Sequence, residues 1–325
     1  AITRTPAGLG VGALAALVLL LFFFVLLSPL ESLHWWAGKG ELEARETFGI
    51  PHQDPHGSAP ASRYVVYLSG IGSIGGDELS RRESAWLARL KEELPEIRVV
   101  DDVFPYAVDN RGLLQRTTVW LWSRVAKWRR HRAIMLFPFL INLRNIAQVL
   151  VSADPRYGPT QSIGLAQEIW RSLRQQGYVP GLGTPVTLIG FSGGGQMALG
   201  ACWFLGGLGI PLSVITIGGI MSDDPGLDRI EHLWCLRGKR DRLQHLGSVG
   251  FPGRWPTAPL STWGRAKHEG RITMRKIGPM QHDGPRGYFA RRTFDEKGDS
   301  YADITLAAVA KILRAQLPGD PTIGA

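Results

Sequence analysis

The stretch VTLIGFSGGGQMALG, residues 186–200, constrains the fold more than any other part of the chain. It begins with aliphatic and β-branched residues, passes through a cluster of glycines around Ser192, and continues into a sequence typical of a helix. A loop that only connects two elements needs neither a strand before it nor a helix after it. The pattern therefore predicts a buried strand that turns abruptly into a helix, with Ser192 at the turn.

Strand and helix patterns alternate over the remainder of residues 63–317. Strands are expected at 63–70, 97–104, 185–190, 211–219, 232–238 and 271–278, and helices at 78–94, 161–178, 194–207 and 301–317. Asp77 is the expected N-terminal cap of the first of these helices. Strands separated by helices predict an α/β fold, with a mostly parallel central sheet and helices on both faces.

The N-terminal part of the chain contains a long uncharged run at residues 8–27. Its length, at about 1.5 Å per residue, matches the roughly 30 Å of a bilayer's hydrocarbon core. A cleaved signal peptide has a shorter apolar core and a small-residue cleavage site, whereas Trp35 and Trp36 suit a membrane interface. We therefore expect a single transmembrane helix, and Arg4 before it places the bulk of the chain on the extracytoplasmic side.

The expected organisation is a membrane anchor at 1–30, a linker rich in Pro, Gly and Ser within 31–62, and a globular domain at 63–325. An insertion at about 106–160 interrupts the alternation of strands and helices. Within it, tryptophans alternate with basic residues before an apolar stretch at 133–143. This insertion is either an amphipathic cap that touches the membrane or a buried helical insertion whose arginines face solvent.

The overall charge and the cysteines limit the partners and cofactors of the chain. The formal net charge of +9 comes with no nucleic-acid-binding motif, so no nucleic-acid partner is expected; an anionic lipid surface or simple solubility accounts for it. Cys202 and Cys235 both fall within predicted core elements and are expected to be buried free thiols. The sequence has no dinucleotide fingerprint and no metal-binding cluster, so no cofactor or metal is expected.

Gly190, Ser192 and Gly194 match the pattern G-x-S-x-G. A strand that turns sharply into a helix forces the residue at the apex into a strained conformation, and the residues two before and two after it must be small. The serine hydroxyl is then presented at the carboxyl edge of the sheet. The pattern, in this strand-to-helix context, predicts that Ser192 is a catalytic nucleophile.

A serine nucleophile requires a base, and the base requires a carboxylate that orients it. Asp241 follows the strand at 232–238, and His282 follows the strand at 271–278, so both are expected at the same sheet edge as Ser192. Two alternatives for the acid, Asp223 and Asp224, follow the preceding strand. Alternatives for the base, His245 and His268, do not directly follow an expected strand.

Backbone amides are expected to stabilise the negative oxygen of the reaction intermediate. One is the amide of Gly193, which follows the nucleophile, and the other comes from the loop after an earlier strand. The glycine-rich sequence LSGIGSIGG at 68–76 provides that loop, and Ile71 is the expected second donor.

These motifs resemble those of the α/β-hydrolase superfamily: GFSGG, GKRD and the His282 loop occur in the expected order, and SGIG stands at the oxyanion position. The resemblance covers residues 63–317 and implies an α/β-hydrolase fold with a sheet of about eight strands and a helical cap. The cap usually enters after a later strand than the insertion in this chain, and the segment at 247–270 is a candidate second wall of the site. Lipases of the superfamily often have HG where this chain has SG.

The resemblance implies a membrane-anchored serine hydrolase that cleaves ester bonds, with Ser192, His282 and Asp241 as its triad. The anchor and the aromatic, basic insertion favour a lipid-like substrate and the lipid bilayer as a partner. Two alternatives stay open from the sequence. One is a non-catalytic subunit or docking protein of a membrane complex that has the hydrolase fold, and the other is a thioesterase or peptidase with the same triad.

Overall fold

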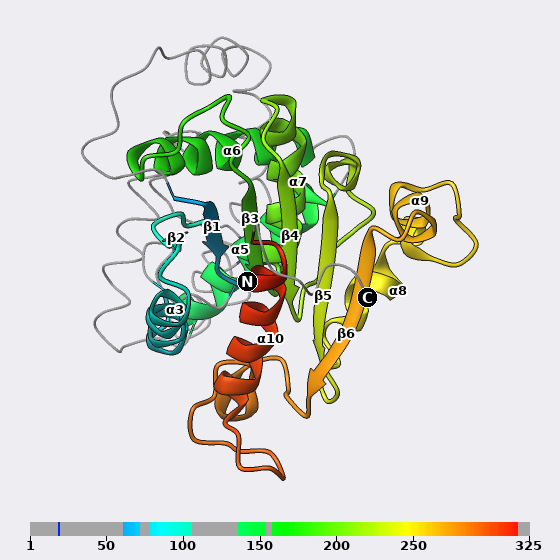
Figure 1. Ribbon diagram of the computed structural model, residues 1–325. Coiled ribbons are helices and arrows are strands. Elements are labelled where there is room, and N and C mark those ends of the chain that lie inside the picture. Colours follow the sequence, from blue (N-terminus) through cyan, green and yellow to red (C-terminus); the bar gives the residue numbers. More distant parts are fainter. Residues whose placement is uncertain (1–18, 20–60, 72–78, 106–135, 154–157, 318–325) are drawn as a thin grey trace, which may run out of the picture.

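A six-stranded, entirely parallel sheet forms the centre of the molecule (Figure 1). The computed structural model describes residues 19, 61–71, 79–105, 136–153 and 158–317. The strands are β1 (Arg63–Leu68), β2 (Ile97–Val100), β3 (Val186–Phe191), β4 (Leu212–Ile217), β5 (His232–Gly238) and β6 (Ile272–Gly278). The α-helices are α3 (Arg81–Glu93), α5 (Leu136–Ser152), α6 (Gly158–Gln175), α7 (Gly194–Gly207), α8 (His245–Gly250), α9 (Thr262–His268) and α10 (Tyr301–Ala315). The predicted α/β architecture is confirmed.

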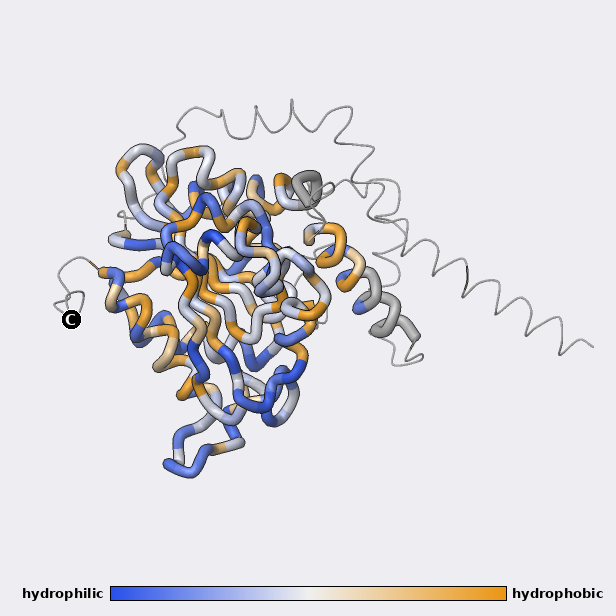
Figure 2. Tube along the Cα trace, turned by 90° about the vertical axis from the view of Figure 1, so that its right-hand side faces the viewer, coloured by the Kyte–Doolittle hydropathy of each residue, from blue (hydrophilic) through white to orange (hydrophobic). Residues whose placement is uncertain are grey.

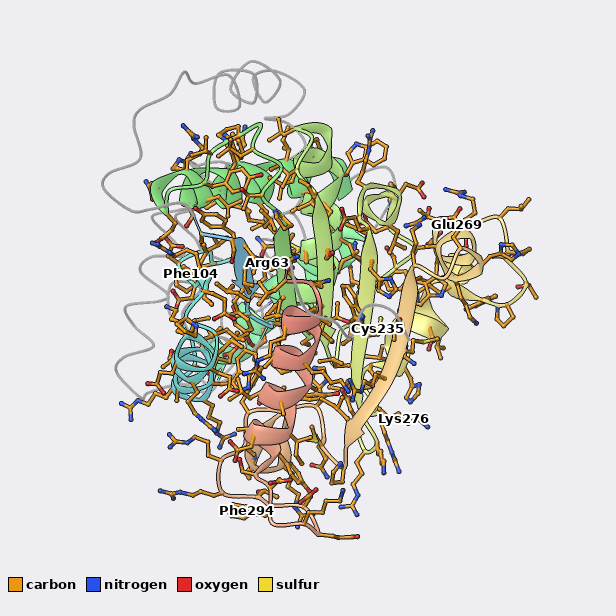
Figure 3. The ribbon with its side chains drawn as sticks, in the orientation of Figure 1. Arg63, Phe104, Cys235, Glu269, Lys276 and Phe294 are labelled. Atoms are coloured by element: carbon orange, nitrogen blue, oxygen red, sulfur yellow. The ribbon has the colours of Figure 1, made fainter. Side chains whose placement is uncertain are left out.

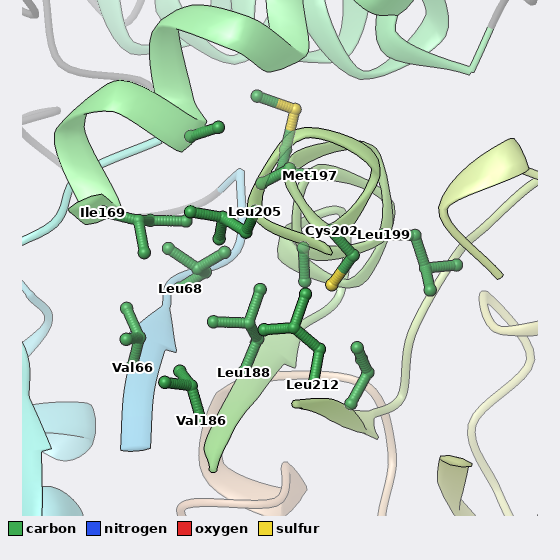
Figure 4. Close-up of a cluster of buried hydrophobic side chains, with 14 of the residues drawn as sticks. Val66, Leu68, Ile169, Val186, Leu188, Met197, Leu199, Cys202, Leu205 and Leu212 are labelled. Carbon is green, nitrogen blue, oxygen red and sulfur yellow. The ribbon is translucent and has the colours of Figure 1, made fainter. Parts of the chain in front are cut away.

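The strands β1, β3 and β4 are buried along their whole length because helices cover both faces of the sheet. Along β1, Val65 and Tyr67 join a hydrophobic cluster that includes residues of α3 and α10. The alternate residues Val66 and Leu68 join a second cluster, on the opposite face, with residues of α6 and α7. Figure 4 shows this second cluster, where Ile169, from α6, lies close to side chains of α7, β1 and β3. The two expected free thiols are confirmed, since Cys202 and Cys235 are both buried and unpaired.

The strand order places a topological switch beside β1. The sheet runs β2-β1-β3-β4-β5-β6, so the chain first winds from β1 to β2 and then crosses back to β3 on the other side of β1. Where the connections after two neighbouring strands run in opposite directions, they separate and leave a crevice at the carboxyl ends of those strands. In this chain the crevice lies beyond the ends of β1 and β3, where Gly70 and Ser192 are found.

The first helix begins later than the sequence prediction placed it. Asp77, the expected cap, lies outside the described residues, and α3 starts at Arg81 with Ser80 as its N-cap. The Ser80 hydroxyl accepts a hydrogen bond from the Glu83 amide, and the Glu83 carboxylate accepts one from the Ser80 amide. This reciprocal capping box satisfies two backbone donors that a helix start leaves without partners, which explains why the helix begins there.

Only the last part of the inserted segment at 106–160 is described. Within it, α5 packs against α6 and α7, with Asn145, Gln148 and Ser152 buried. This helix therefore belongs to the layer that covers one face of the sheet. The tryptophan-rich part of the insertion lies outside the described residues.

The expected membrane anchor also lies outside the described residues, apart from Leu19. Among the helices that the structure does describe, none has both the length and the apolar character needed to cross a bilayer.

Candidate active site

Ser192 occupies a sharp turn between β3 and α7. Its φ angle is +54°, and it is the only residue other than glycine with positive φ in the described part of the chain. This left-handed conformation is costly for a residue with a side chain, and it persists only where the surrounding structure fixes it. The Ser192 amide donates to the Ile217 carbonyl at 3.1 Å, and the Ser192 carbonyl accepts from the amides of Gly195 and Ile220. The predicted strand-to-helix turn is confirmed.

The glycines on both sides of Ser192 are required by close backbone approach. A Cβ atom added at Gly190 would lie 2.6 Å from backbone atoms of Gly194. One added at Gly194 would lie 2.5 Å from the Leu68 carbonyl oxygen. The turn is therefore pressed against the end of β1, and no larger residue fits at either position.

Ser192, His282 and Asp241 form one continuous chain of hydrogen bonds. The Ser192 Oγ lies 2.7 Å from His282 Nε2, and His282 Nδ1 lies 3.0 Å from Asp241 Oδ2. An ionised carboxylate only accepts hydrogen bonds, so Nδ1 is the nitrogen that donates to Asp241. Nε2 is then the acceptor for the serine hydroxyl, which is the arrangement that a general base requires.

The Asp241 carboxylate is fully buried and accepts hydrogen bonds from four donors. Its Oδ2 accepts from His282 and, at 2.7 Å, from the Tyr288 hydroxyl. Its Oδ1 accepts from the amides of Leu243 and Gln244. Burial alone would raise the pKa of Asp241, but the bond and charge of His282 and the bonds from Tyr288 and Gln244 outweigh it and lower this pKa.

Tyr288 is a site residue that the sequence prediction missed. Its hydroxyl donates to Asp241 and accepts from the Gly238 amide at 2.8 Å, so it links the acid to the end of β5. Burial, followed by the nearby Asp241 charge, raises the pKa of Tyr288 well above its ordinary value. No local pattern marks this residue, because the contact joins residues far apart in the sequence.

The alternative acids and bases lie in other environments. Asp224 caps a short 3₁₀ helix, Pro225–Arg229, and accepts from the Gln196 side chain at 2.7 Å, and its burial raises its pKa to about 6. Asp223 lies close to the backbone of Gly253. His245 and His268 are exposed at the start of α8 and the end of α9. Of these candidates, the structure brings Asp241 and His282 to Ser192.

The two expected oxyanion donors come from the start of α7 and from the loop after β1. Gly193 is the N-cap of α7, and no oxygen among the described residues accepts a hydrogen bond from its amide. Gly70 approaches so closely that a Cβ there would lie 3.0 Å from the Ser192 Cβ, which places the Gly70 backbone beside Ser192. The Ile71 carbonyl accepts a bond from the Asn145 side chain of α5, which ties this loop to the insertion.

Phe191 fixes the imidazole from one side. Its ring stacks on His282 with centroids 5.5 Å apart and an interplanar angle of 24°. Two further rings pack against Phe191 in edge-to-face contacts, Phe289 with its centroid 5.0 Å away and Tyr288 with its centroid 6.2 Å away. The residue between the glycine and the serine of the motif is thus a platform for the base, a role that the sequence prediction did not assign.

A pocket of about 460 Å³ opens beside Ser192 and His282. It is lined by Gly70, Ile71, Ser80, Arg81, Arg82, Glu83, Phe191, Ser192, His282, Asp283, Gly284 and Phe289. The volume lies within the range of small-molecule sites. None of the lining residues comes from 247–270, so the expectation that this segment forms a wall of the site is wrong for this pocket.

Glu83 belongs both to the capping box of α3 and to the wall of the pocket. Its carboxylate is buried and accepts from the Tyr67 hydroxyl at 2.8 Å as well as from the Ser80 amide. Burial raises its pKa, although these hydrogen bonds act in the opposite direction. The pair Ser80 and Glu83 could have been recognised in the sequence as a capping box, but not as part of a pocket wall.

The described residues contain no group of three or more His, Cys, Asp or Glu side chains arranged to hold a metal ion. Comparison with known proteins found no family model that matches this chain. A comparison with curated proteins likewise found no significant match.

Proposed function

We propose that this chain is a membrane-anchored serine hydrolase that cleaves ester bonds through an acyl-enzyme intermediate. The observation that carries the proposal is the hydrogen-bond chain from Ser192 through His282 to Asp241, with distances of 2.7 and 3.0 Å. Its support is that three polar groups from the ends of β3, β5 and β6 meet with the donor and acceptor roles that nucleophilic catalysis needs.

In the proposed reaction, the Ser192 Oγ attacks the ester carbonyl while His282 Nε2 accepts the hydroxyl proton. The Nδ1–H donates to Asp241, whose carboxylate stabilises the imidazolium that forms. The amides of Gly193 and Ile71 stabilise the negative oxygen of the tetrahedral intermediate. His282 then gives its proton to the leaving alcohol. In the second half of the reaction, a water molecule attacks the acyl carbonyl while His282 accepts its proton. His282 finally returns a proton to the Ser192 Oγ as the carboxylic acid is released.

We further propose that the fold is that of the α/β-hydrolase superfamily. The support is the order of the site residues along the chain, Ser192, Asp241 and then His282, at the ends of successive strands of a parallel sheet. The elbow with positive φ at Ser192 and the required glycines at positions 190 and 194 also support it.

The proposed substrate is an amphipathic, lipid-like ester. The pocket combines the apolar side chains of Ile71, Phe191 and Phe289 with the exposed guanidinium groups of Arg81 and Arg82. Such a lining suits a molecule with an apolar part and a polar part. The uncharged run at residues 8–27 is a second support, because a tethered enzyme meets membrane-resident substrates first.

The test is active-site labelling of the full-length protein in detergent with a fluorophosphonate, followed by an ester screen. Wild type is expected to be labelled, and Ser192→Ala is expected to lose the label. Ser213→Ala is the matched control, because Ser213 is also buried, at 3% exposure against 7% for Ser192, but lies in β4 away from the triad. The control variant is expected to be labelled like wild type.

The outcomes separate the candidate functions. No labelling of a folded wild type would overturn the hydrolase proposal and favour the non-catalytic subunit. Labelling together with cleavage of short water-soluble esters but not of dispersed lipid esters would overturn only the lipid-like substrate. Faster turnover of thioesters or peptides than of esters would assign the triad to the thioesterase or peptidase alternative.

A further inference from the structure

The segment Lys239–Lys276, which follows β5 and runs into β6, has an unusual composition. It contains nine lysine and arginine residues against two acidic residues, Asp241 and Glu269. Its formal charge of +7 therefore accounts for most of the +9 of the whole chain. Most of the net positive charge of the chain is therefore concentrated in about an eighth of its residues.

Most of this charge is exposed and not compensated. Arg265 and Arg271 form ion pairs with Asp228 and Glu269. Arg254 is buried, with its guanidinium 3.8 Å from the centroid of the Trp263 ring. For the other six, no ion pair with an acidic side chain occurs within the part of the chain that the structure covers. These six exposed cations are Lys239, Arg240, Arg242, Lys267, Arg275 and Lys276.

The same segment exposes large apolar side chains. They are Leu243, Leu246, Val249, Trp255 and Leu260, with exposed fractions of 47, 55, 70, 46 and 83%. Leu246 and Val249 are three residues apart in α8, so they share one side of that helix, and Leu243 directly precedes its N-cap, Gln244. The Trp255 indole donates to the Val249 carbonyl at 3.3 Å, which brings it beside them.

The apolar and basic groups lie on the same flank of the molecule. The Arg265 side chain donates to the Leu260 carbonyl at 2.8 Å. The amides of Lys239 and Arg240 donate to the carbonyls of Gly278, the last residue of β6, and of Met280 just beyond it. Figure 1 shows α8 and α9 beside β6, and Figure 3 places Lys276 and Glu269 along this outer edge. Figure 2 turns this flank toward the viewer and shows hydrophobic and hydrophilic residues interleaved on it.

The last strand is uncovered on this flank. Thr273, Met274, Arg275 and Lys276 are all exposed, although successive residues of a strand point to opposite faces of a sheet. β6 is the edge strand, and within the described residues no strand pairs with its outer side. Two adjacent basic residues on such an edge oppose pairing with another strand.

The chemistry of this flank selects its partner. A twofold contact with a second copy would bring the same six cations together, which costs free energy through repulsion of like charges. An anionic bilayer instead provides both a negative surface for the cations and an apolar interior for leucine, valine and tryptophan side chains. The chain also has its own uncharged run at residues 8–27, long enough to reach across a bilayer.

We propose that the Lys239–Lys276 segment is a docking surface that lays the domain on a bilayer rich in anionic lipid. Arg240 and Arg242 flank Asp241, so the surface begins at the acid of the candidate triad. The docking surface is independent of the proposed chemistry, because the exposed charges and apolar side chains are not those that contact Ser192.

The test uses the fact that the native cysteines, Cys202 and Cys235, are both buried. A single added cysteine is therefore the site that an environment-sensitive fluorophore labels. The full-length variants Val249→Cys and Leu260→Cys report on the docking surface. Leu182→Cys is the matched control, because Leu182 is 64% exposed but lies in the loop before β3, outside the docking surface. Each variant is reconstituted in vesicles of phosphatidylcholine with and without phosphatidylglycerol.

In vesicles that contain phosphatidylglycerol, the labels at positions 249 and 260 are expected to shift to the blue and to be quenched by brominated lipid, while the label at position 182 is not. Neutralising Arg275 and Lys276 to glutamine is expected to lower the ratio of docked to undocked protein about fivefold for each charge removed. Lys311→Gln, an exposed lysine on α10, is the charge control and is expected to leave the ratio unchanged.

Three results would overturn the proposal. The first is an equal response at all three positions, or none at any. The second is an equal response in pure phosphatidylcholine, which would remove the role of the charges. The third is a blue shift in detergent that grows with protein concentration, which would assign the surface to a second copy. Fluorophosphonate labelling of the same variants in detergent reads the triad separately, so failure of docking and failure of the hydrolase proposal are distinguishable.

Discussion

The contact between Tyr288 and Asp241 makes a quantitative prediction. Tyr288→Phe removes one hydroxyl and leaves the ring, so packing against Phe191 is retained. The change deletes a 2.7 Å hydrogen bond to the Asp241 carboxylate and a 2.8 Å bond from the Gly238 amide. A hydrogen bond to a charged group stabilises a protein by about 1.5–3 kcal/mol, and a buried amide left without an acceptor costs about 1–3 kcal/mol.

Two effects of Tyr288→Phe are expected. The free energy of unfolding falls by about 2–4 kcal/mol, less than the sum of both terms because the site relaxes. The Asp241 carboxylate, with one donor fewer, also holds the protonated imidazole of His282 more tightly. The rate of fluorophosphonate labelling therefore declines at a higher pH than in wild type as the solution is made more acidic, by up to about one pH unit.

The assay is the labelling rate from pH 5 to 9 together with denaturant unfolding, on wild type, Tyr288→Phe and Tyr178→Phe. Tyr178 is a matched control, because it is also buried and its hydroxyl donates one bond, to the Thr184 carbonyl, far from the triad. The control is expected to change stability without moving the pH profile. If Tyr288→Phe lowers stability but its pH profile coincides with that of wild type, the hydroxyl does not tune Asp241 and the reasoning is refuted.

Three further changes test the turn, the platform and the second buried acid. Gly194→Ala places a Cβ 2.5 Å from the Leu68 oxygen and is expected to cost about 1–3 kcal/mol of stability and most of the labelling, whereas Gly207→Ala, with nothing within 4 Å, costs neither; thermal unfolding and labelling check this. Phe191→Leu removes the ring stacked on His282 and is expected to slow labelling more than Phe289→Leu, which leaves that stack intact; equal slowing would contradict the platform role. Because burial raises the Asp224 pKa from 3.8 to about 6, its contribution to stability is present below pH 4 and lost as pH rises through about 6, by about 3 kcal/mol. Asp224→Asn is expected to lack this loss, which is checked by measuring the free energy of unfolding against pH for the variant and wild type. Parallel curves would contradict a contribution of Asp224 to the pH dependence.

Local patterns in the sequence were sufficient to predict the strands and helices. They were also sufficient to name Ser192, Asp241 and His282 as the candidate triad. Each expected strand is present, and β1, β3 and β4 read as short, mainly apolar runs because these parallel strands are buried on both faces. The 97–104 strand ends early, at Val100, and α3 begins late, at Arg81, because caps and turn residues fix boundaries more than apolar spacing does.

Contacts between distant parts of the chain could not be predicted. Tyr288 and Phe191 contact the acid and the base only after the sheet has formed, and no spacing rule marks them. The strand order, which puts β1 between β2 and β3, is set by how helices pack on the sheet and not by any single segment. The burial of Glu83 in the pocket wall follows from the same packing.

The two sides of the crevice between β1 and β3 come from separate parts of the sequence. The reacting side chains follow β3, β5 and β6, whereas the wall formed by Ser80, Arg81, Arg82 and Glu83 comes from the start of α3, more than a hundred residues earlier. If the proposed hydrolase activity is demonstrated, substitutions at residues 79–83 would change which substrates the pocket accepts while the candidate triad stays the same.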